Sequence, residues 1–243
     1  MKKQIFTILL CIVISGAFAQ EKTGGVTTRY VFNEKTVVKD SSGKAYPYPV
    51  WHQLMISGNY VLKPTNPGAS ELEYVLVQLT PAQKADRLSR MPPPAASPYF
   101  TTGQHIKPFK IKDIYGNKLE AKDWAGKTIV LNFWFIGCPP CQAEIPELNK
   151  IAADYKDDPN VVFIGIALDE DFEIKDFIKN TPFNYRLVGD GRYYANLFKI
   201  HSFPTNVVIN RSGNVVFYST GYGMATPKWI ANAIVADMTP LQQ

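Results

Sequence analysis

Beyond residue 99, continuous apolar runs alternate with stretches whose apolar residues recur at helical spacing. The runs at 129–135 and 161–168 are typical of strands that are covered on both faces of a sheet. Between them, residues 139–155 place Ile145 and Leu148 on one stripe, which predicts a helix. Alternation of this kind favours an α/β fold with a mixed central sheet and helices on both faces. Further along, the same patterns predict a helix at 172–178, a strand at 185–188, a helix at 193–198, strands at 205–209 and 215–218, and a helix from Thr226 to Met238.

Residues 20–91 have shorter apolar runs and predict a small β-rich domain that ends in a helix. Thr80 and Gln83 match a capping box, and Pro81 suits the first helical position, so this helix is expected to run to about Arg90. The proline-rich stretch at 92–98 is stiff and predicts a linker before a second domain at 99–243. The β-prone runs of the first domain lie at 30–32, 36–38, 55–62 and 72–79.

The first 19 residues have the pattern of a secretory signal peptide. Two lysines precede an apolar stretch at 5–14, and Ala17-Phe18-Ala19 is a small-x-small cleavage signal. The apolar run is shorter than the roughly 20 residues that span a bilayer, although an uncleaved anchor is the alternative. We therefore expect an exported, periplasmic protein with no stable membrane insertion after cleavage. Without the two lysines the net charge falls from +5 to about +3, too little to imply a nucleic-acid partner.

Cleavage also removes Cys11 and leaves two cysteines, Cys138 and Cys141. A bridge that closes two intervening residues constrains the unfolded chain very little, so the pair is expected to be reactive. Half of a zinc site is the alternative, but no second cysteine pair or close histidine pair supplies further ligands. The pair lies where a predicted strand gives way to a helix, whose first amides and dipole stabilise a thiolate. We expect Cys138 to be an exposed nucleophile and Cys141 to be the buried resolving thiol.

Three stretches of sequence resemble a known family. They are Cys138-Pro139-Pro140-Cys141, Leu131-Asn132-Phe133-Trp134 before it, and Phe203-Pro204-Thr205 downstream. Together they resemble the thioredoxin fold, and in detail its exported TlpA/ResA-like branch, over residues 103–238. The resemblance implies a protein thiol–disulfide oxidoreductase that uses no cofactor or metal and exchanges disulfides with protein partners, often as a reductant. Residues 20–91 lie outside it.

The resemblance also implies roles for individual residues. Pro204 matches a loop proline whose preceding peptide is cis and which faces the cysteines, so residues 203–205, with Pro139 and Pro140, are expected to hold the substrate. Glu144 shares a helix face with Cys141 and matches an acid of ResA-like proteins. It is expected to accept the proton of Cys141, or else only to complement the helix dipole. Gly137 replaces the aromatic residue that this family usually has before the first cysteine.

Several alternatives stay open at this point. We expect the protein to reduce misoxidised or maturing envelope proteins with electrons from a membrane-bound donor. The alternative within the same class is a disulfide oxidase or isomerase. Cys138, Cys141 and His201 could form a copper site like that of copper-delivery proteins, although those space their cysteines by three residues. A peroxiredoxin is disfavoured because Phe135 stands where those proteins have threonine. Finally, the protein could be a binding module whose disulfide is never reduced and re-formed.

Overall fold

The computed structural model describes residues 32–66 and 73–239, and the predicted signal peptide lies outside them. The described residues from Glu34 onward belong to one unit. A boundary within it at 92–98 stays a prediction. Within the described ranges, no helix is both long enough and apolar enough to cross a membrane.

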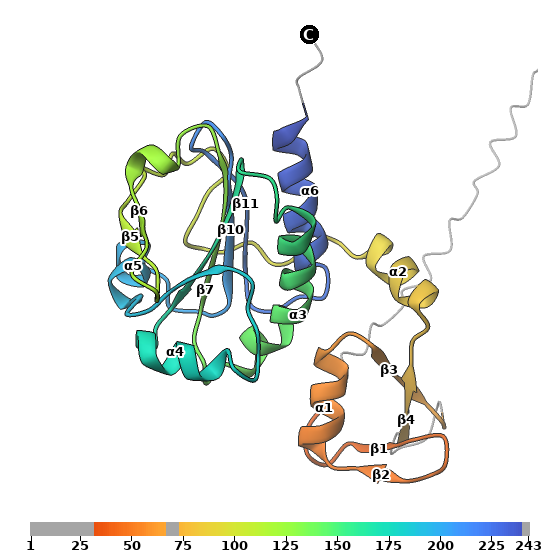
Figure 1. The fold of residues 1–243 in the computed structure, drawn as a ribbon. Helices are drawn as coiled ribbons and strands as arrows, with labels where there is room; N and C mark the ends of the chain where they lie inside the picture. The colour runs from red at the N-terminus through yellow and green to blue at the C-terminus, as the bar shows by residue number, and fades with distance from the viewer. Residues whose placement is uncertain (1–31, 67–72, 240–243) are drawn as a thin grey trace, which may run out of the picture. The chain divides into compact units, whose positions relative to one another are not determined.

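A mixed five-stranded sheet is the centre of the second half of the chain (Figure 1). Its strands lie in the order β11-β10-β7-β8-β9, with β7, β8 and β9 parallel and β10 and β11 antiparallel to their neighbours. Every residue of β7 is buried, because both faces of the sheet are covered. The bounds are β7 (Thr128–Trp134), β8 (Val161–Ala167), β9 (Arg186–Val188), β10 (Thr205–Ile209) and β11 (Val215–Thr220).

Helices cover both faces of this sheet, and Figure 1 shows α3 and α6 on the opposite side from α5 and the β5–β6 hairpin. Alternate side chains of β7 point to opposite faces. Val130 and Trp134 belong to one core with α3, α4 and α6, whereas Leu131 and Phe133 belong to the other with α5 and the hairpin. The predicted α/β class is therefore confirmed. The bounds are α3 (Pro139–Asp154), α4 (Asp171–Phe177), α5 (Arg192–Leu197), α6 (Thr226–Met238), β5 (Ile111–Lys112), β6 (Lys118–Leu119) and a 3-10 turn (Ala121–Asp123).

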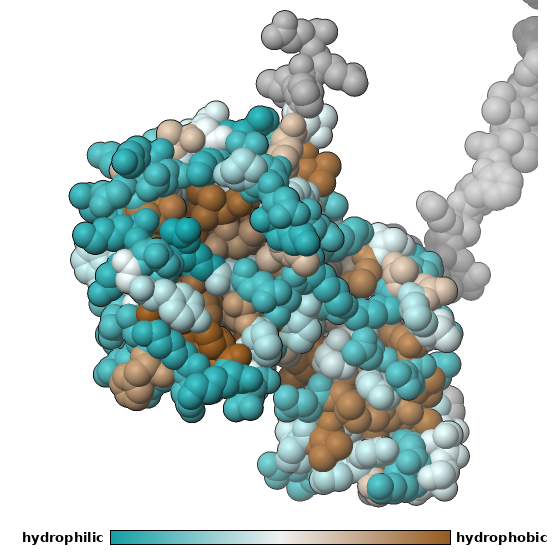
Figure 2. All heavy atoms as spheres, in the orientation of Figure 1, coloured by the Kyte–Doolittle hydropathy of each residue, from teal (hydrophilic) through white to brown (hydrophobic). Residues whose placement is uncertain are grey.

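The N-terminal part has a four-stranded sheet in the order β2-β1-β4-β3, with two helices. Val38, Trp51, Tyr74 and Leu76 form its core. The predicted helix cap is confirmed, since the Thr80 side chain accepts from the Gln83 N–H and the Gln83 side chain accepts in return. Apolar side chains are also visible on the surface over the N-terminal elements (Figure 2). The bounds are β1 (Val37–Lys39), β2 (Ala45–Tyr46), α1 (Tyr48–Ile56), β3 (Tyr60–Pro64), β4 (Glu73–Gln78) and α2 (Pro81–Arg90).

The predicted strand at 55–62 is wrong at its start, because Met55 and Ile56 end helix α1. Trp51 is the buried residue of this helix, and the ring of Tyr48 stacks on His52 one turn further on, at 5.0 Å between centroids. Side chains three and four residues apart share a helix face, so aromatic contacts at this spacing support a helix. The strand prediction followed β-propensity alone, and tertiary packing around Trp51 overrides it.

Candidate active site

Cys138 and Cys141 form a disulfide at the start of α3, with 5.2 Å between their Cα atoms. Cys138 is the N-cap residue of the helix, and its Sγ accepts from the Cys141 N–H at 3.2 Å. Pro139 suits the first helical position because the amide it lacks would have no partner there. The positive end of the helix therefore faces the Cys138 sulfur and would stabilise a thiolate on it. Pro146 lies inside α3.

The loop between β7 and α3 is held from both sides by residues that the sequence analysis missed. The Ile136 N–H donates to Asp169 Oδ2 at 2.7 Å, and Gln142 Nε2 donates to the Ile136 carbonyl at 2.6 Å. Asp169 follows the apolar run of β8, and polar residues just beyond a parallel strand gather at the edge of the sheet where sites form. That position was the available signal. The loop is thus fixed independently of the disulfide.

Cys138 was expected to be exposed, and in the disulfide-bonded protein this is wrong. Its exposed fraction is 3%, and that of Cys141 is 1%. The sulfur of an N-cap residue turns back towards the amides of the first helical turn, and Phe135 and Phe203 pack against the same core cluster. Gly137 and Pro139, which flank Cys138, are the exposed parts of the loop.

Residues 203–205 lie beside this loop through the pairing of β10 with β7, which sets Thr205 opposite Phe133. The Phe203–Pro204 peptide bond is cis, and the Phe203 ring lies 5.5 Å from that of Phe135. Thr205 is fully buried, and its hydroxyl donates to the carbonyl three residues earlier at 2.8 Å. The Thr205 side chain therefore faces the interior and stabilises the loop. At this residue only the backbone could contact a substrate.

Glu144 is completely buried and lies one turn along α3 from Cys141. Its Oε1 accepts from Asn132 Nδ2 at 2.6 Å, and its Oε2 accepts from Asn206 Nδ2 at 3.1 Å. Asn132 Nδ2 also donates to Asn206 Oδ1 at 2.9 Å. Asn206 is a further residue that the sequence analysis missed. A polar residue directly before the apolar run at 207–209 was the signal for it.

Burial raises the pKa of Glu144 to about 8, and the hydrogen bonds from the two asparagines oppose this only in part. The ionised carboxylate lacks water and a neighbouring cation, so the protonated form is favoured up to neutral pH. Burial, together with the charge of Glu144, also raises the pKa of Tyr185 well above its usual range. The same two causes, with a smaller contribution from Glu147, raise the pKa of Tyr222 to about 12.

His201 is exposed, and its ring centroid lies 6.1 Å from that of Tyr99. Within residues 32–66 and 73–239, no group of three or more His, Cys, Asp or Glu side chains could hold a metal ion. The structure therefore does not bring His201 together with the two cysteines as a ligand set. The copper-site alternative has no support from the geometry.

Comparison with known proteins gives one consistent result. The AhpC/TSA family model matches residues 102–218. The thiol-disulfide oxidoreductase ResA of Bacillus thuringiensis subsp. konkukian is 32% identical over 126 residues, which cover 49% of this chain and 72% of the relative. A thiol:disulfide interchange protein of the thioredoxin family from Chlorobium tepidum is similar in structure, with a TM-score of 0.50 at 21% identity over 58% of this chain and 99% of its own. A Bacteroides thetaiotaomicron structure described as a protein disulfide isomerase has a TM-score of 0.53 at 24% identity. The match covers 59% of this chain and 94% of the Bacteroides chain. These structural similarities concern the fold alone.

Proposed function

Since the chain belongs to the ResA family of thiol-disulfide oxidoreductases, we propose that Cys138 and Cys141 form the dithiol that reduces the disulfides of its protein substrates. The Cys138 thiolate attacks one substrate sulfur, which forms a mixed disulfide and releases the other substrate sulfur as a thiolate. Cys141 then attacks the Cys138 sulfur, which releases the second substrate thiol and closes the Cys138–Cys141 disulfide. Two electrons pass to the substrate in one cycle.

The observation that carries this proposal is the Cys141 N–H directed at Cys138 Sγ at the first turn of α3. A helix amide and dipole favour the thiolate over the thiol, and the thiolate is the nucleophile in disulfide exchange. Cys138 is also bordered by exposed Gly137 and Pro139, whereas Cys141 lies one turn inside the helix. This asymmetry supports Cys138 as the attacking residue and Cys141 as the resolving one.

Glu144 is proposed to take the proton that Cys141 must lose before it attacks. Both residues are buried on the same face of α3, with exposed fractions of 0% and 1%. A pKa of about 8 leaves a small ionised fraction of Glu144 at neutral pH, which suits a group that both accepts and returns a proton. A dipole-complementing role alone does not explain why the carboxyl is buried between two asparagines.

Residues 203–205, with Pro139 and Pro140, are proposed to contact the substrate. The backbone at Phe203 and Pro204 lies next to the loop that carries Cys138, as the β10–β7 register and the Phe203–Phe135 contact indicate. An extended substrate segment can pair with such a backbone while its sulfur approaches Cys138. Pro139 is exposed and Pro140 half-buried at the same edge, so both are available to a docked segment.

The protein is proposed to work in the periplasm on envelope proteins and to receive electrons from a membrane-bound donor. The support is the signal-like pattern of residues 1–19 and the persistence of disulfides outside the cytoplasm. A reductant in that compartment needs a continuing electron source, because its dithiol is consumed in each cycle.

Insulin reduction tests the activity, with Cys138→Ser and Cys141→Ser as inactive controls for turnover. Equilibration with thiol buffers then tests the direction of electron flow. A reduction potential near or below about −270 mV supports a reductant, while one near about −120 mV would make the protein an oxidase. If the reduced protein, with Cys138 and Cys141 as thiols, does not reduce insulin at all, the proposed activity is refuted.

A further inference from the structure

The loop that follows β11 connects the substrate-contacting backbone to the N-terminal elements. The Gly221 N–H donates to the carbonyl of Pro204 at 2.8 Å. Three residues on, Met224 packs against Gly58 so closely that a Cβ on the glycine would lie 2.3 Å from Met224 Sδ. Gly58 has φ +72°, in the region where glycine is favoured, and it lies in the turn that follows α1. The turn at 57–59 therefore touches the loop that holds the Pro204 peptide.

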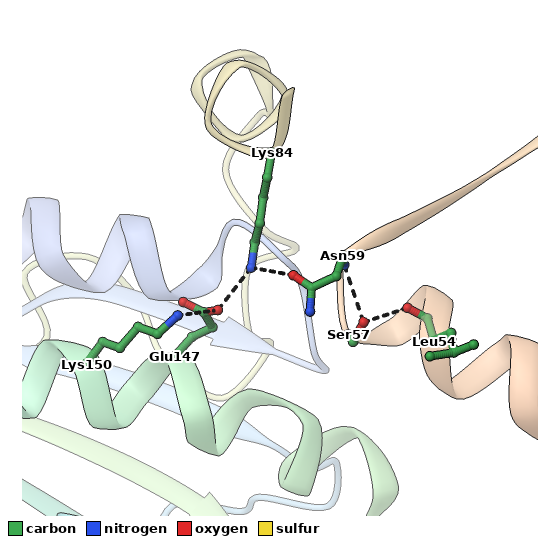
Figure 3. Close-up of polar contacts among 6 residues, drawn as sticks. All are labelled: Leu54, Ser57, Asn59, Lys84, Glu147 and Lys150. Atoms are coloured by element: carbon green, nitrogen blue, oxygen red, sulfur yellow. Dashed lines mark hydrogen bonds and ion pairs between the residues drawn. The ribbon is translucent and has the colours of Figure 1, made fainter. Parts of the chain in front are cut away.

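A second contact fastens the same turn to α3 through Lys84 of α2 (Figure 3). Lys84 Nζ donates to Asn59 Oδ1 and to Glu147 Oε1, each at 3.0 Å, and Lys150 Nζ also lies 3.0 Å from Glu147 Oε1. The Lys84 and Glu147 side chains are 24% and 30% exposed. An ion pair that is shielded to this extent is screened less by salt than a fully exposed one. One ammonium group thus joins α2, the turn and the helix that carries the cysteines.

Helix α2 is attached at its other end as well. Lys228 Nζ of α6 lies 3.2 Å from the carbonyl of Leu88 and 3.4 Å from that of Ser89, in the last turn of α2. A cation at the carboxyl end of a helix complements its dipole and its unpaired carbonyls. A cavity of about 220 Å³, lined by residues that include Lys84, Tyr222 and Met224, lies along this contact. Both ends of α2 are therefore fixed to helices on the face of the sheet that bears the cysteines.

We propose that residues 57–59 together with α2 act as a brace for the substrate-binding edge. In this inference Lys84 and Met224 are positioning residues. They hold loop 221–224, whose Gly221 N–H is bonded to the Pro204 carbonyl, and so they hold the neighbouring backbone of Phe203, where an extended segment of a protein substrate pairs. The inference rests on the proposed function, because it needs protein disulfides as substrates. A small disulfide has no polypeptide strand to pair, so the brace favours protein substrates over small ones.

The test compares two substrates in the full chain: insulin, and bis(2-hydroxyethyl) disulfide, which has no peptide backbone. Lys84→Met keeps the aliphatic stem and removes the ammonium group that joins Asn59 to Glu147. We expect KM for insulin to rise by about three- to tenfold, the size of the net contribution of one ordinary hydrogen bond. The rate with bis(2-hydroxyethyl) disulfide and the reduction potential should not change. Lys110→Met is the matched control, because it breaks the exposed ion pair with Glu120, at 2.9 Å, and leaves the brace intact.

Met224→Ala is the second variant, since it removes the side chain that rests on Gly58. Both variants should speed amide hydrogen exchange in peptides that cover 219–225, while exchange in β7 and β8 stays as in the unmodified protein. Unchanged exchange at 219–225 together with an unchanged KM for insulin would overturn the brace. Equal losses with both substrates, or a general rise in exchange, would also overturn it, because they indicate only lower stability. If the unmodified protein reduces neither substrate, the proposed function fails instead.

Discussion

Replacing Glu144 with glutamine changes how the stability of the oxidised protein depends on pH. Glutamine has nearly the same shape and keeps an oxygen that accepts the hydrogen bond from Asn132, but it does not titrate. Because the pKa of Glu144 is raised in the folded protein, the folded state holds its proton more tightly than the unfolded chain does. The contribution of protonated Glu144 to stability is therefore fully present below the ordinary pKa of 4.5 and is lost as the pH rises towards about 8.

The size of the effect follows from the burial of this carboxyl. Its exposed fraction is 0%, so no solvent screening reduces the penalty on the charged form. Each unit of pKa difference corresponds to about 1.4 kcal/mol, so the rise from 4.5 to about 8 corresponds to roughly 5 kcal/mol at high pH. Across the interval between these two values, this one group should remove about 1.4 kcal/mol of unfolding free energy per pH unit.

The assay is urea unfolding of both oxidised proteins at several pH values between 5 and 8. Other titrating groups affect both proteins alike, so the difference in unfolding free energy isolates Glu144. Relative to the unmodified protein, Glu144→Gln should gain stability by about 1.4 kcal/mol for each pH unit. A difference that stays constant with pH would show that Glu144 titrates normally and would refute the account of the buried carboxyl. In reduction assays, the same variant should lose the rise in rate with pH that the ionisation of Glu144 gives.

Three further substitutions test other parts of the structure. Asn206→Ala removes a hydrogen bond that lowers the pKa of Glu144, so carboxyl-carbon NMR should show titration at higher pH, and titration at unchanged or lower pH would contradict this. Gly165→Ala places a Cβ 2.9 Å from Leu187 Cδ2 inside the buried sheet and should cost about 1–3 kcal/mol in urea unfolding; no loss would mean that the core yields easily. Thr80→Ala removes the cap of α2 and should cost about 1 kcal/mol, while Thr80→Ser should restore most of it.

The elements of the second half were predictable because local pattern and burial agree there. Strand β7 is continuously apolar and buried on both faces, and α3 has a regular apolar stripe. In the N-terminal part the pattern is weaker. Helix α1 was missed because its contacts depend on Trp51 packing against strands β1 and β4, which come together only in the folded chain. The short hairpin β5–β6 was missed as well, since two-residue strands leave almost no periodic signal.

The cysteine pair could be identified from the sequence, whereas the polar groups around it could not. Asn132 and Asn206 lie 74 residues apart and meet only because β7 pairs with β10 in this register. Asp169 likewise reaches the Ile136 amide from the end of another strand. The burial of Cys138 also depends on tertiary packing, because Phe203 packs against the same cluster from a distant part of the chain. Contacts between distant segments depend on the register of the paired strands, and no single segment of the sequence determines that register.

Trapping of the mixed disulfide tests the central claim most directly. Cys141→Ser protein, reduced and then mixed with oxidised insulin, should accumulate a covalent complex that contains one insulin molecule. Peptide mass mapping should place the linkage at Cys138, and Cys138→Ser protein should give no such complex. A complex formed by the Cys138→Ser protein with its linkage at Cys141, or equal trapping by both variants, would contradict the assignment of nucleophile and resolving residue. Absence of any complex, with insulin left oxidised, would contradict disulfide exchange at this site altogether.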